Sequence, residues 1–129
     1  MRDIIFRGKR LNNGEWVEGD YFRKYIYDRY DNGSLHHLIG WQVTDNDGEK
    51  FNDYEDVDPD TVGQYTGLQD KNGKKIFEGD ILSDGAFTYE VRYKGTGFVT
   101  ILDGHVYTMD TRPTKIVIGN IHDNPELLK

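Results

Sequence analysis

Apolar and polar residues alternate most clearly over residues 87–94, which read FTYEVRYK. Every second residue from Phe87 to Tyr93 is apolar or aromatic, and the residues between them are polar. This period of two predicts a half-buried β-strand with one dry face and one wet face. Shorter unbroken apolar runs at 98–102 and 116–118 predict strands that are buried on both faces or lie at the centre of a sheet.

Glycine-containing dipeptides divide the chain into segments of strand length. Asn-Gly occurs at 13–14, 32–33 and 72–73, and Asp-Gly occurs at 47–48. Both dipeptides suit a type I′ turn, in which two consecutive residues have positive φ. Helix signals are limited to two places where a capping residue precedes a proline, Asp58-Pro59 and Asn124-Pro125. The pattern therefore predicts an all-β protein with minimal helix.

A hairpin around Asn32-Gly33 presents a stripe of aromatic and basic residues. If this dipeptide is a two-residue loop, Tyr25 lies opposite Gly40. Tyrosine and arginine are enriched at binding hot spots, and aromatic rings can stack on bases. We therefore predict an interaction surface on this hairpin, and the alternative is that the same face packs against another part of the protein. The stripe consists of Tyr21, Arg23, Tyr25 and Tyr27.

Two segments of the chain repeat the same three elements in the same order. Each has an aromatic residue two positions before a glycine, then Asn-Gly, then Glu-Gly-Asp. The first copy runs from Phe6 to Asp20 and the second from Tyr65 to Asp80. We interpret each copy as a hairpin followed by a bend at Gly-Asp.

The predicted fold is a single domain with two related, strongly bent antiparallel β-units. We place the units at residues 1–56 and 57–129 and expect each to be a small, barrel-like sheet. One interpretation of the C-terminal half is an SH3-like arrangement, because Gly79-Asp80 leads into a strand that is followed by a meander of short strands.

Composition limits the kinds of function that need to be considered. The 129 residues include no cysteine, which excludes disulfides and thiolate zinc sites. Charged residues interrupt the apolar N-terminus, so no signal peptide is predicted, and no apolar stretch is long enough for a membrane span; the default location is cytoplasmic. The net charge of −7 disfavours nucleic-acid binding, although residues 2–10 carry four basic side chains.

The polar residues do not form a recognisable catalytic or metal-binding motif. His36 and His37 are adjacent in a predicted strand and point to opposite faces, so the pair does not suit one metal ion, and we expect His37 to pair with Asp28. The acids at 45–49 resemble part of a calcium loop but are better explained as a hairpin turn. We interpret the acidic residues 53–60 as a solvated loop, and the alternative is that they attract a cation or a basic partner. We predict no catalytic residue, no cofactor and no metal ligand.

Several segments resemble the YopX family, a group of small proteins of bacteriophages and prophages, mostly from Gram-positive bacteria. The longest runs from Gly63-Gln-Tyr-Thr-Gly67 to Glu78-Gly79-Asp80, and the resemblance extends to the segments 2–8, 57–67 and 118–128. Residues 23–56 match least. The resemblance implies a mainly β fold and a cytoplasmic setting in an infected or lysogenic bacterial host. It implies no biochemical activity, catalytic residue or cofactor.

Three hypotheses for function follow. The first is a non-catalytic phage or prophage accessory protein that binds another protein or assembles into a homo-oligomer through the tyrosine stripe. The second is a small-barrel nucleic-acid-binding protein that uses Arg23 and the tyrosines, or the basic residues 2–10. The third is a metal-dependent hydrolase that uses His36, His37 or His105 with nearby acids.

Overall fold

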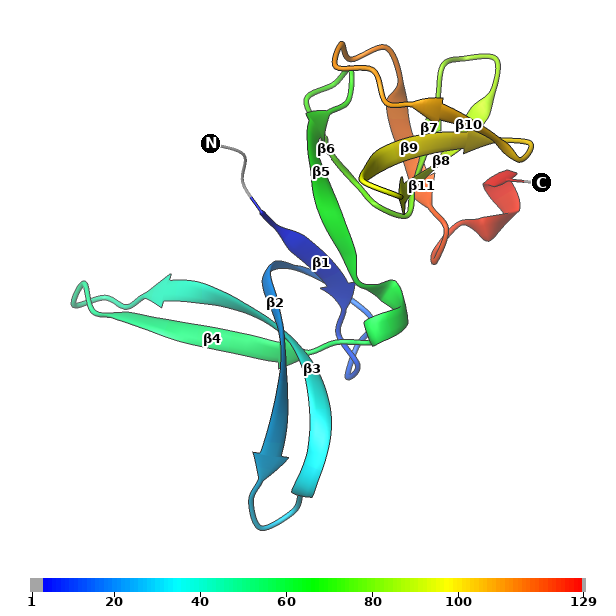
Figure 1. Cartoon of the computed structure of the whole chain (residues 1–129). Helices are drawn as coiled ribbons and strands as arrows, with labels where there is room; N and C mark the ends of the chain where they lie inside the picture. The colour runs from blue at the N-terminus through cyan, green and yellow to red at the C-terminus, as the bar shows by residue number, and fades with distance from the viewer. Residues whose placement is uncertain (1–3, 129) are drawn as a thin grey trace. The chain divides into compact units, whose positions relative to one another are not determined.

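The computed structural model describes residues 4–128, whose regular secondary structure is almost entirely β-strand (Figure 1). Within them there is no α-helix, and no helical segment has the length and hydropathy of a membrane span. Arg2, which belongs to the predicted basic segment 2–10, lies outside the described residues. The strands are β1 (Phe6–Lys9), β2 (Trp16–Tyr27), β3 (Asn32–Thr44), β4 (Lys50–Asp56), β5 (Gly63–Gln69), β6 (Lys75–Phe77), β7 (Asp80–Ser83), β8 (Thr88–Lys94), β9 (Gly97–Leu102), β10 (His105–Thr108) and β11 (Ile116–Asn120).

Two short 3₁₀ helices occur where the sequence predicted them. The first, η1 (Pro59–Thr61), is capped by Asp58, whose side chain accepts a hydrogen bond from the Asp60 amide. The second, η2 (Pro125–Leu128), follows Asn124. In both cases proline occupies the first helical position, where its missing N–H is not needed.

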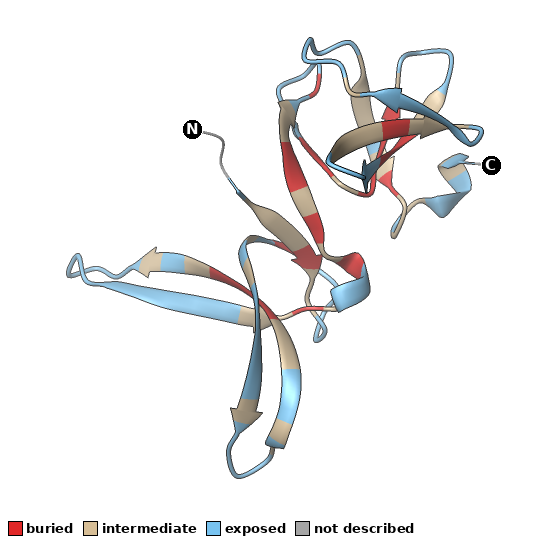
Figure 2. Ribbon diagram, in the orientation of Figure 1, coloured by how far each residue is buried: buried red, intermediate tan, exposed pale blue. Residues whose placement is uncertain are grey.

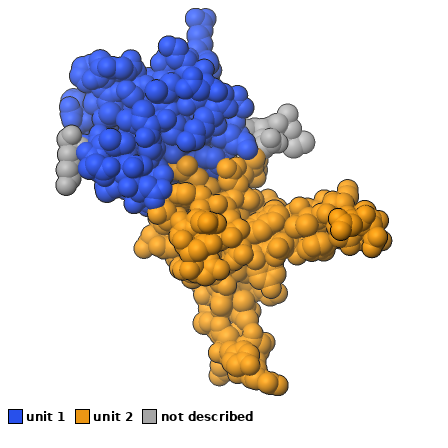
Figure 3. Space-filling view, turned by 180° about the vertical axis from the view of Figure 1, so that it is seen from behind, with its two compact units in different colours: residues 1–3, 64–129 blue, residues 4–63 orange. Residues whose placement is uncertain are grey.

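The chain divides into two compact units, shown in different colours in Figure 3. We call residues 4–63 the N-terminal unit and residues 64–128 the C-terminal unit. The predicted boundary lay between residues 56 and 57. The observed boundary comes after η1, because Val57 belongs to the core of the N-terminal unit.

The N-terminal unit is an antiparallel sheet in which strands follow one another in the order β4-β3-β2-β1. The long strand β3 bends, so that its first half pairs with β2 and its second half pairs with β4. The two pairings diverge as narrow projections (Figures 1 and 3). We call the β2–β3 projection the first arm and the β3–β4 projection the second arm.

A small core lies where the two arms meet. Val17, Ile39 and Val57 are buried there, and partly buried apolar side chains pack around them. Figure 2 shows the buried segments of the ribbon in red and the mostly exposed arms in pale blue. Val17 and Ile39 lie on the same face of the sheet, as the register of β1, β2 and β3 requires. Most of each arm lies beyond this core and is exposed. The surrounding side chains are Phe6, Tyr21, Trp41 and Val62.

The C-terminal unit contains the β5–β6 hairpin and an antiparallel sheet of five strands. β7 to β10 form a meander, and β11 returns to pair with β7, which gives the order β10-β9-β8-β7-β11. Ile76, Leu82 and Val91 form its core. The prediction of two bent, antiparallel β-units is confirmed. The five-stranded sheet ends at β10 and β11 and does not close into a barrel, and the SH3-like interpretation stays a prediction.

The predicted dry face of the strand at 87–94 is wrong in part. Val91 is fully buried, as expected, but Phe87 and Tyr93 are exposed and Glu90 is 7% exposed. Val91 points into the core, and η2 also packs against β8, so that Glu90 and Val91 are both buried although they point to opposite faces. The ends of the strand extend beyond this cover. Alternation in the sequence therefore predicted the strand correctly but did not predict which of its residues are buried.

Two other strands are less buried than the sequence predicted. β11 contains the apolar run 116–118 but lies at a sheet edge, and Ile118 is exposed. In β9, Thr100 is the buried residue, and its apolar neighbours are half-buried. Burial of these runs depended on their place in the sheet, which the sequence did not give.

The glycine turns are real, but most are not type I′. At Asp45–Glu49 and Asp70–Lys74 only the glycine has positive φ, with values of 83° for both Gly48 and Gly73. The leading aspartate accepts two backbone N–H groups across each turn, which fixes a type I turn followed by a left-handed glycine. Asp103 and Gly104, between β9 and β10, both have positive φ, as a type I′ turn requires.

The register of the first arm differs from the prediction. Tyr25 pairs with Leu35, not with Gly40, and Gly33 lies within β3 at a bulge. The turn is formed by residues 28–31 instead, because the Asp28 carboxylate accepts the amides of Tyr30 and Asp31. The change in register is an odd number of residues, so it reverses the face on which each β3 side chain lies relative to β2.

Candidate interaction surface

The predicted stripe separates into an anchored residue and an exposed remainder. Tyr21 is half-buried, its ring lies 5.7 Å from that of Phe6, and its hydroxyl is 2.7 Å from His37 Nδ1. It therefore belongs to the base of the first arm and packs against the core. The hydrogen bond also corrects the predicted pairing of His37 with Asp28.

Arg23 and Tyr25 share a face of the first arm and both are exposed. Tyr25 is 61% exposed and pairs across the arm with Leu35, which is 41% exposed. An aromatic residue opposite an aliphatic one is a stabilising cross-strand pair, yet here it also leaves a continuous apolar surface in water. Arg23 extends the surface toward His37, its partner in β3.

Tyr27 lies beyond the bulge and has a different role from Arg23 and Tyr25. It is 72% exposed, and its ring covers the backbone of Gly33, so closely that a side chain at position 33 would collide with it. Glycine is needed there for a second reason, since its φ is 96°. The sequence predicted a tyrosine over a bare glycine, but the pair is Tyr27 with Gly33 rather than Tyr25 with Gly40.

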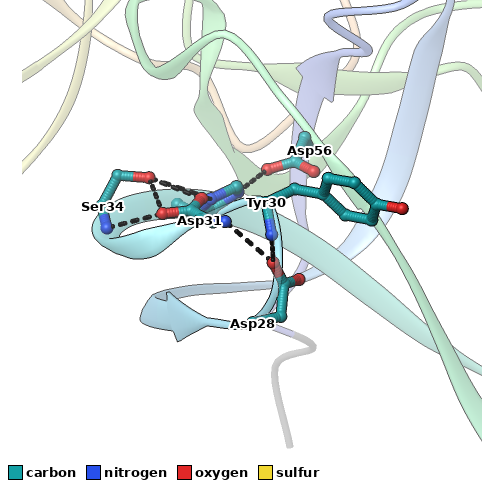
Figure 4. A network of polar contacts seen from close by, with 6 residues as sticks. Asp28, Tyr30, Asp31, Ser34 and Asp56 are labelled. Carbon is teal, nitrogen blue, oxygen red and sulfur yellow. Dashed lines mark hydrogen bonds and ion pairs between the residues drawn. The ribbon is translucent and has the colours of Figure 1, made fainter.

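A histidine with two carboxylate partners ties the tip of the first arm to β4. His36 Nε2 lies 2.6 Å from Asp31, and His36 Nδ1 lies 2.5 Å from Asp56 (Figure 4). The hydrogen bonds that the His36 ring donates to Asp31 and, with a smaller effect, to Asp56 raise the pKa of His36 above its usual 6.5. We call this group the histidine clasp. It makes the arm a braced structure rather than a free ribbon.

Asp31 is held as a carboxylate within the clasp. Its carboxylate accepts hydrogen bonds from the Ser34 hydroxyl, the His36 ring and the Ser34 amide, in decreasing order of effect. Together they hold the pKa of Asp31 well below its usual range. Ser34 Oγ is also 3.3 Å from His36 Nε2, so a serine, a histidine and an aspartate are neighbours.

This neighbourhood differs from a catalytic triad in one decisive respect. In a triad the histidine accepts the serine proton at Nε2. Here Asp31 lies against both Ser34 and His36 Nε2, so that the serine and the histidine each donate to the same carboxylate. A doubly hydrogen-bonded imidazolium cannot act as the base. The geometry favours a structural role.

The remaining candidate residues do not converge. Within residues 4–128 there is no group of three or more histidine, aspartate or glutamate side chains arranged to hold a metal ion. The acids at 45–49 form a hairpin turn. Residues 53–60, predicted as a solvated loop, instead form the end of β4 and the start of η1.

Sequence reasoning missed an aromatic pair on the opposite face of the sheet. Phe22 of β2 and Tyr54 of β4 pack edge to face, with ring centroids 6.3 Å apart, over Gly40 in the strand between them. They border a surface hollow of about 470 Å³. A glycine within an apolar strand was the available signal, but finding its neighbours required the register of three strands.

Comparison with known proteins gives a family match and a structural match. The model of the YopX protein family matches residues 5–129. Among solved structures, the chain is similar to protein EF1440 from Enterococcus faecalis, with 28% identity, a TM-score of 0.59 and coverage of 100% of both chains. No curated protein matches the chain.

Proposed function

The chain belongs to the YopX family, and on that basis we propose that it is a non-catalytic phage or prophage accessory protein that binds another protein through the first arm. The observation that carries this proposal is the exposed face formed by Arg23, Tyr25 and Leu35. We take the setting to be the cytoplasm of a bacterial host, which is what the family resemblance implies.

The composition of this face suits a protein partner. Binding energy at protein interfaces concentrates in a few tyrosine, tryptophan and arginine side chains surrounded by apolar contacts. Tyr25 and Leu35 would lose unfavourable contact with water on binding, and Arg23 supplies a charged donor beside them. A second copy of the chain could dock on the same face, which would make the protein a homo-oligomer.

The histidine clasp contributes to the proposal by limiting motion. A long two-stranded ribbon is marginally stable by itself. Because His36 joins the tip to Asp56 of β4, the arm is ordered before a partner arrives. Less conformational entropy is then lost on binding.

The test is affinity purification from bacterial cells followed by mass spectrometry, with light scattering to measure the mass of the purified protein. The double substitution Tyr25→Ala/Tyr27→Ala should weaken partner retention at least about tenfold, because both side chains are exposed hot-spot types. The matched control is Tyr93→Ala/Tyr107→Ala, which removes two half-exposed tyrosines from the C-terminal unit and should change nothing.

Three outcomes would overturn the proposal. One is a monomer that retains no partner. Another is equal loss of binding in the variant and the control. The third is tight, steeply salt-dependent binding to oligonucleotides, which would support the nucleic-acid alternative instead.

A further inference from the structure

The hollow beside Phe22 and Tyr54 lies on the face of the N-terminal unit opposite the core. Tyr54 pairs with Gly40, and Phe22 lies two residues beyond Asp20, the partner of Gly40 in β2. Strand alternation therefore places Phe22, Gly40 and Tyr54 on one face, opposite Ile39 and Trp41. Phe22 is 39% exposed and Tyr54 is 51% exposed, so two aromatic rings face water at one place. We call this site the aromatic hollow.

Gly40 gives the aromatic hollow its shape. A Cβ atom at position 40 would lie 3.1 Å from Phe22 Cε1 and 3.2 Å from the Asp53 carbonyl oxygen. Phe22 and Tyr54 therefore approach bare backbone, and a side chain at position 40 would crowd them. Flanking polar side chains from Gln42 and Asn52 complete the lining.

The charged side chain on the face of the aromatic hollow is acidic. It is Asp20, at the start of the first arm, which pairs with Gly40. Asp53 also borders the hollow, but it pairs with Trp41, so its side chain leaves β4 on the opposite face, and its carboxylate accepts the Tyr54 amide. Across residues 4–128, Asp20 forms no ion pair. Exposed aromatic rings beside an uncompensated carboxylate are the surroundings that a cation prefers.

We propose that the aromatic hollow binds an arginine side chain presented by the partner protein. A guanidinium group stacks on an aromatic ring through its flat face and donates N–H groups in its plane to carboxylates. An apolar side chain would leave the Asp20 carboxylate without a partner, and a phosphate would be repelled by it. The site deepens the proposed function because it gives the kind of residue that the partner carries, at a place distinct from the Tyr25 face.

Nuclear magnetic resonance titration of the purified protein tests this assignment without any partner. The probe is a blocked nonapeptide in which three arginines are separated by glycine and serine, and the control peptide has citrulline, the uncharged isostere, in place of arginine. The arginine peptide should shift the amide signals of Gly40, Gln42 and Tyr54, and added salt should weaken the binding. The citrulline peptide should not shift these signals.

Two variants localise the effect. Tyr54→Ala should weaken binding of the arginine peptide about two- to fivefold, the range expected for an exposed cation–π contact. Phe51→Ala removes an equally exposed ring from the same strand but the opposite face and should leave the affinity unchanged. Asp20→Asn should remove most of the salt dependence while leaving the amide spectrum of the fold intact.

Equal binding of the citrulline peptide, equal loss in Tyr54→Ala and Phe51→Ala, or shifts that avoid Gly40 would each overturn the arginine site. The titration stands apart from the partner experiment. If partner retention depends on Tyr25 but the peptide does not bind, only the arginine site fails. If the peptide binds at Gly40 and no partner is retained, the proposed function fails and the site remains.

Discussion

The two copies of the internal repeat contain the same three residues, Glu-Gly-Asp, and fold them differently. In the first copy, Glu18-Gly19-Asp20 lies within β2, which continues as the first arm. In the second copy, Glu78-Gly79 forms a bend between β6 and β7, and Asp80 begins the new strand. The predicted bend at Gly-Asp is therefore right for the second copy and wrong for the first.

The surroundings of the two glycines and the two aspartates explain the difference. Gly79 has a φ of 91°, and Asp80, which is 1% exposed, accepts the Phe77 amide across the bend. Gly19 has ordinary strand geometry and is needed because the Gly40 carbonyl oxygen of β3 lies against it. Asp20 is exposed. The glycine therefore allows a positive φ in the second copy and the close approach of β3 in the first copy.

Replacing the aspartate should give the largest difference in stability between the two copies. Asp80→Ala should destabilise the protein by about 2–3 kcal/mol, because the buried Phe77 amide loses a charged acceptor. Asp20→Ala, its counterpart in the first copy, should change stability by less than about 0.5 kcal/mol, as an exposed substitution does. Urea unfolding measured by circular dichroism gives both values, and equal effects would contradict the comparison.

Substitutions at Gly19 and Gly79 should show why glycine is required at each position. Gly79→Ala and Gly19→Ala should each cost about 1–2 kcal/mol, the first through positive φ and the second through collision with β3. Asparagine tolerates positive φ better than alanine but is larger. Gly79→Asn should therefore be less harmful than Gly79→Ala, whereas Gly19→Asn should be more harmful than Gly19→Ala. The same order at both positions would show that one mechanism acts in both copies.

The first arm, which exists because β2 does not bend at Gly19, should respond to pH through its clasp. The pKa of His36 is raised in the folded protein. Its contribution to the stability of the arm is therefore complete below about pH 6.5 and is lost as the pH rises through the folded-state pKa. The pKa of Asp31 is lowered in the folded protein. Its contribution to the stability of the arm is therefore complete above about pH 3.8 and is lost as the pH falls through the folded-state pKa. The clasp should therefore be strongest between these two values.

Nuclear magnetic resonance of the His36 ring and hydrogen exchange of the arm amides measure this response. His36 should titrate above 6.5, although desolvation of its ring opposes the rise in pKa. Asp31→Asn should bring the midpoint back toward 6.5, and the protection of arm amides, relative to their intrinsic exchange rates, should fall at high pH. Asp28→Asn alters a carboxylate that accepts only backbone groups and is the control. A wild-type midpoint at or below 6.5 would refute the clasp.

Part of the candidate surface could be foreseen from the sequence and part could not. The alternation around Arg23 and Tyr25 placed both residues on one face of a strand but left open whether that face is exposed or packed, and the structure shows both residues exposed. It could not separate Tyr21, which packs into the core, from the others, because all of them share one period. Phe22 and Tyr54 were missed because residues 32 positions apart become neighbours only through a third strand.

The sequence by itself determined that the chain forms antiparallel strands joined by glycine turns, with 3₁₀ turns at its two capped prolines. Those features depend on local alternation and on the φ that each residue tolerates. Tertiary structure alone decided the register of the first arm, the burial of Glu90 and the different roles of Gly19 and Gly79. These depend on side-chain hydrogen bonds within turns and on which strands lie alongside, and such information is not carried by any short segment.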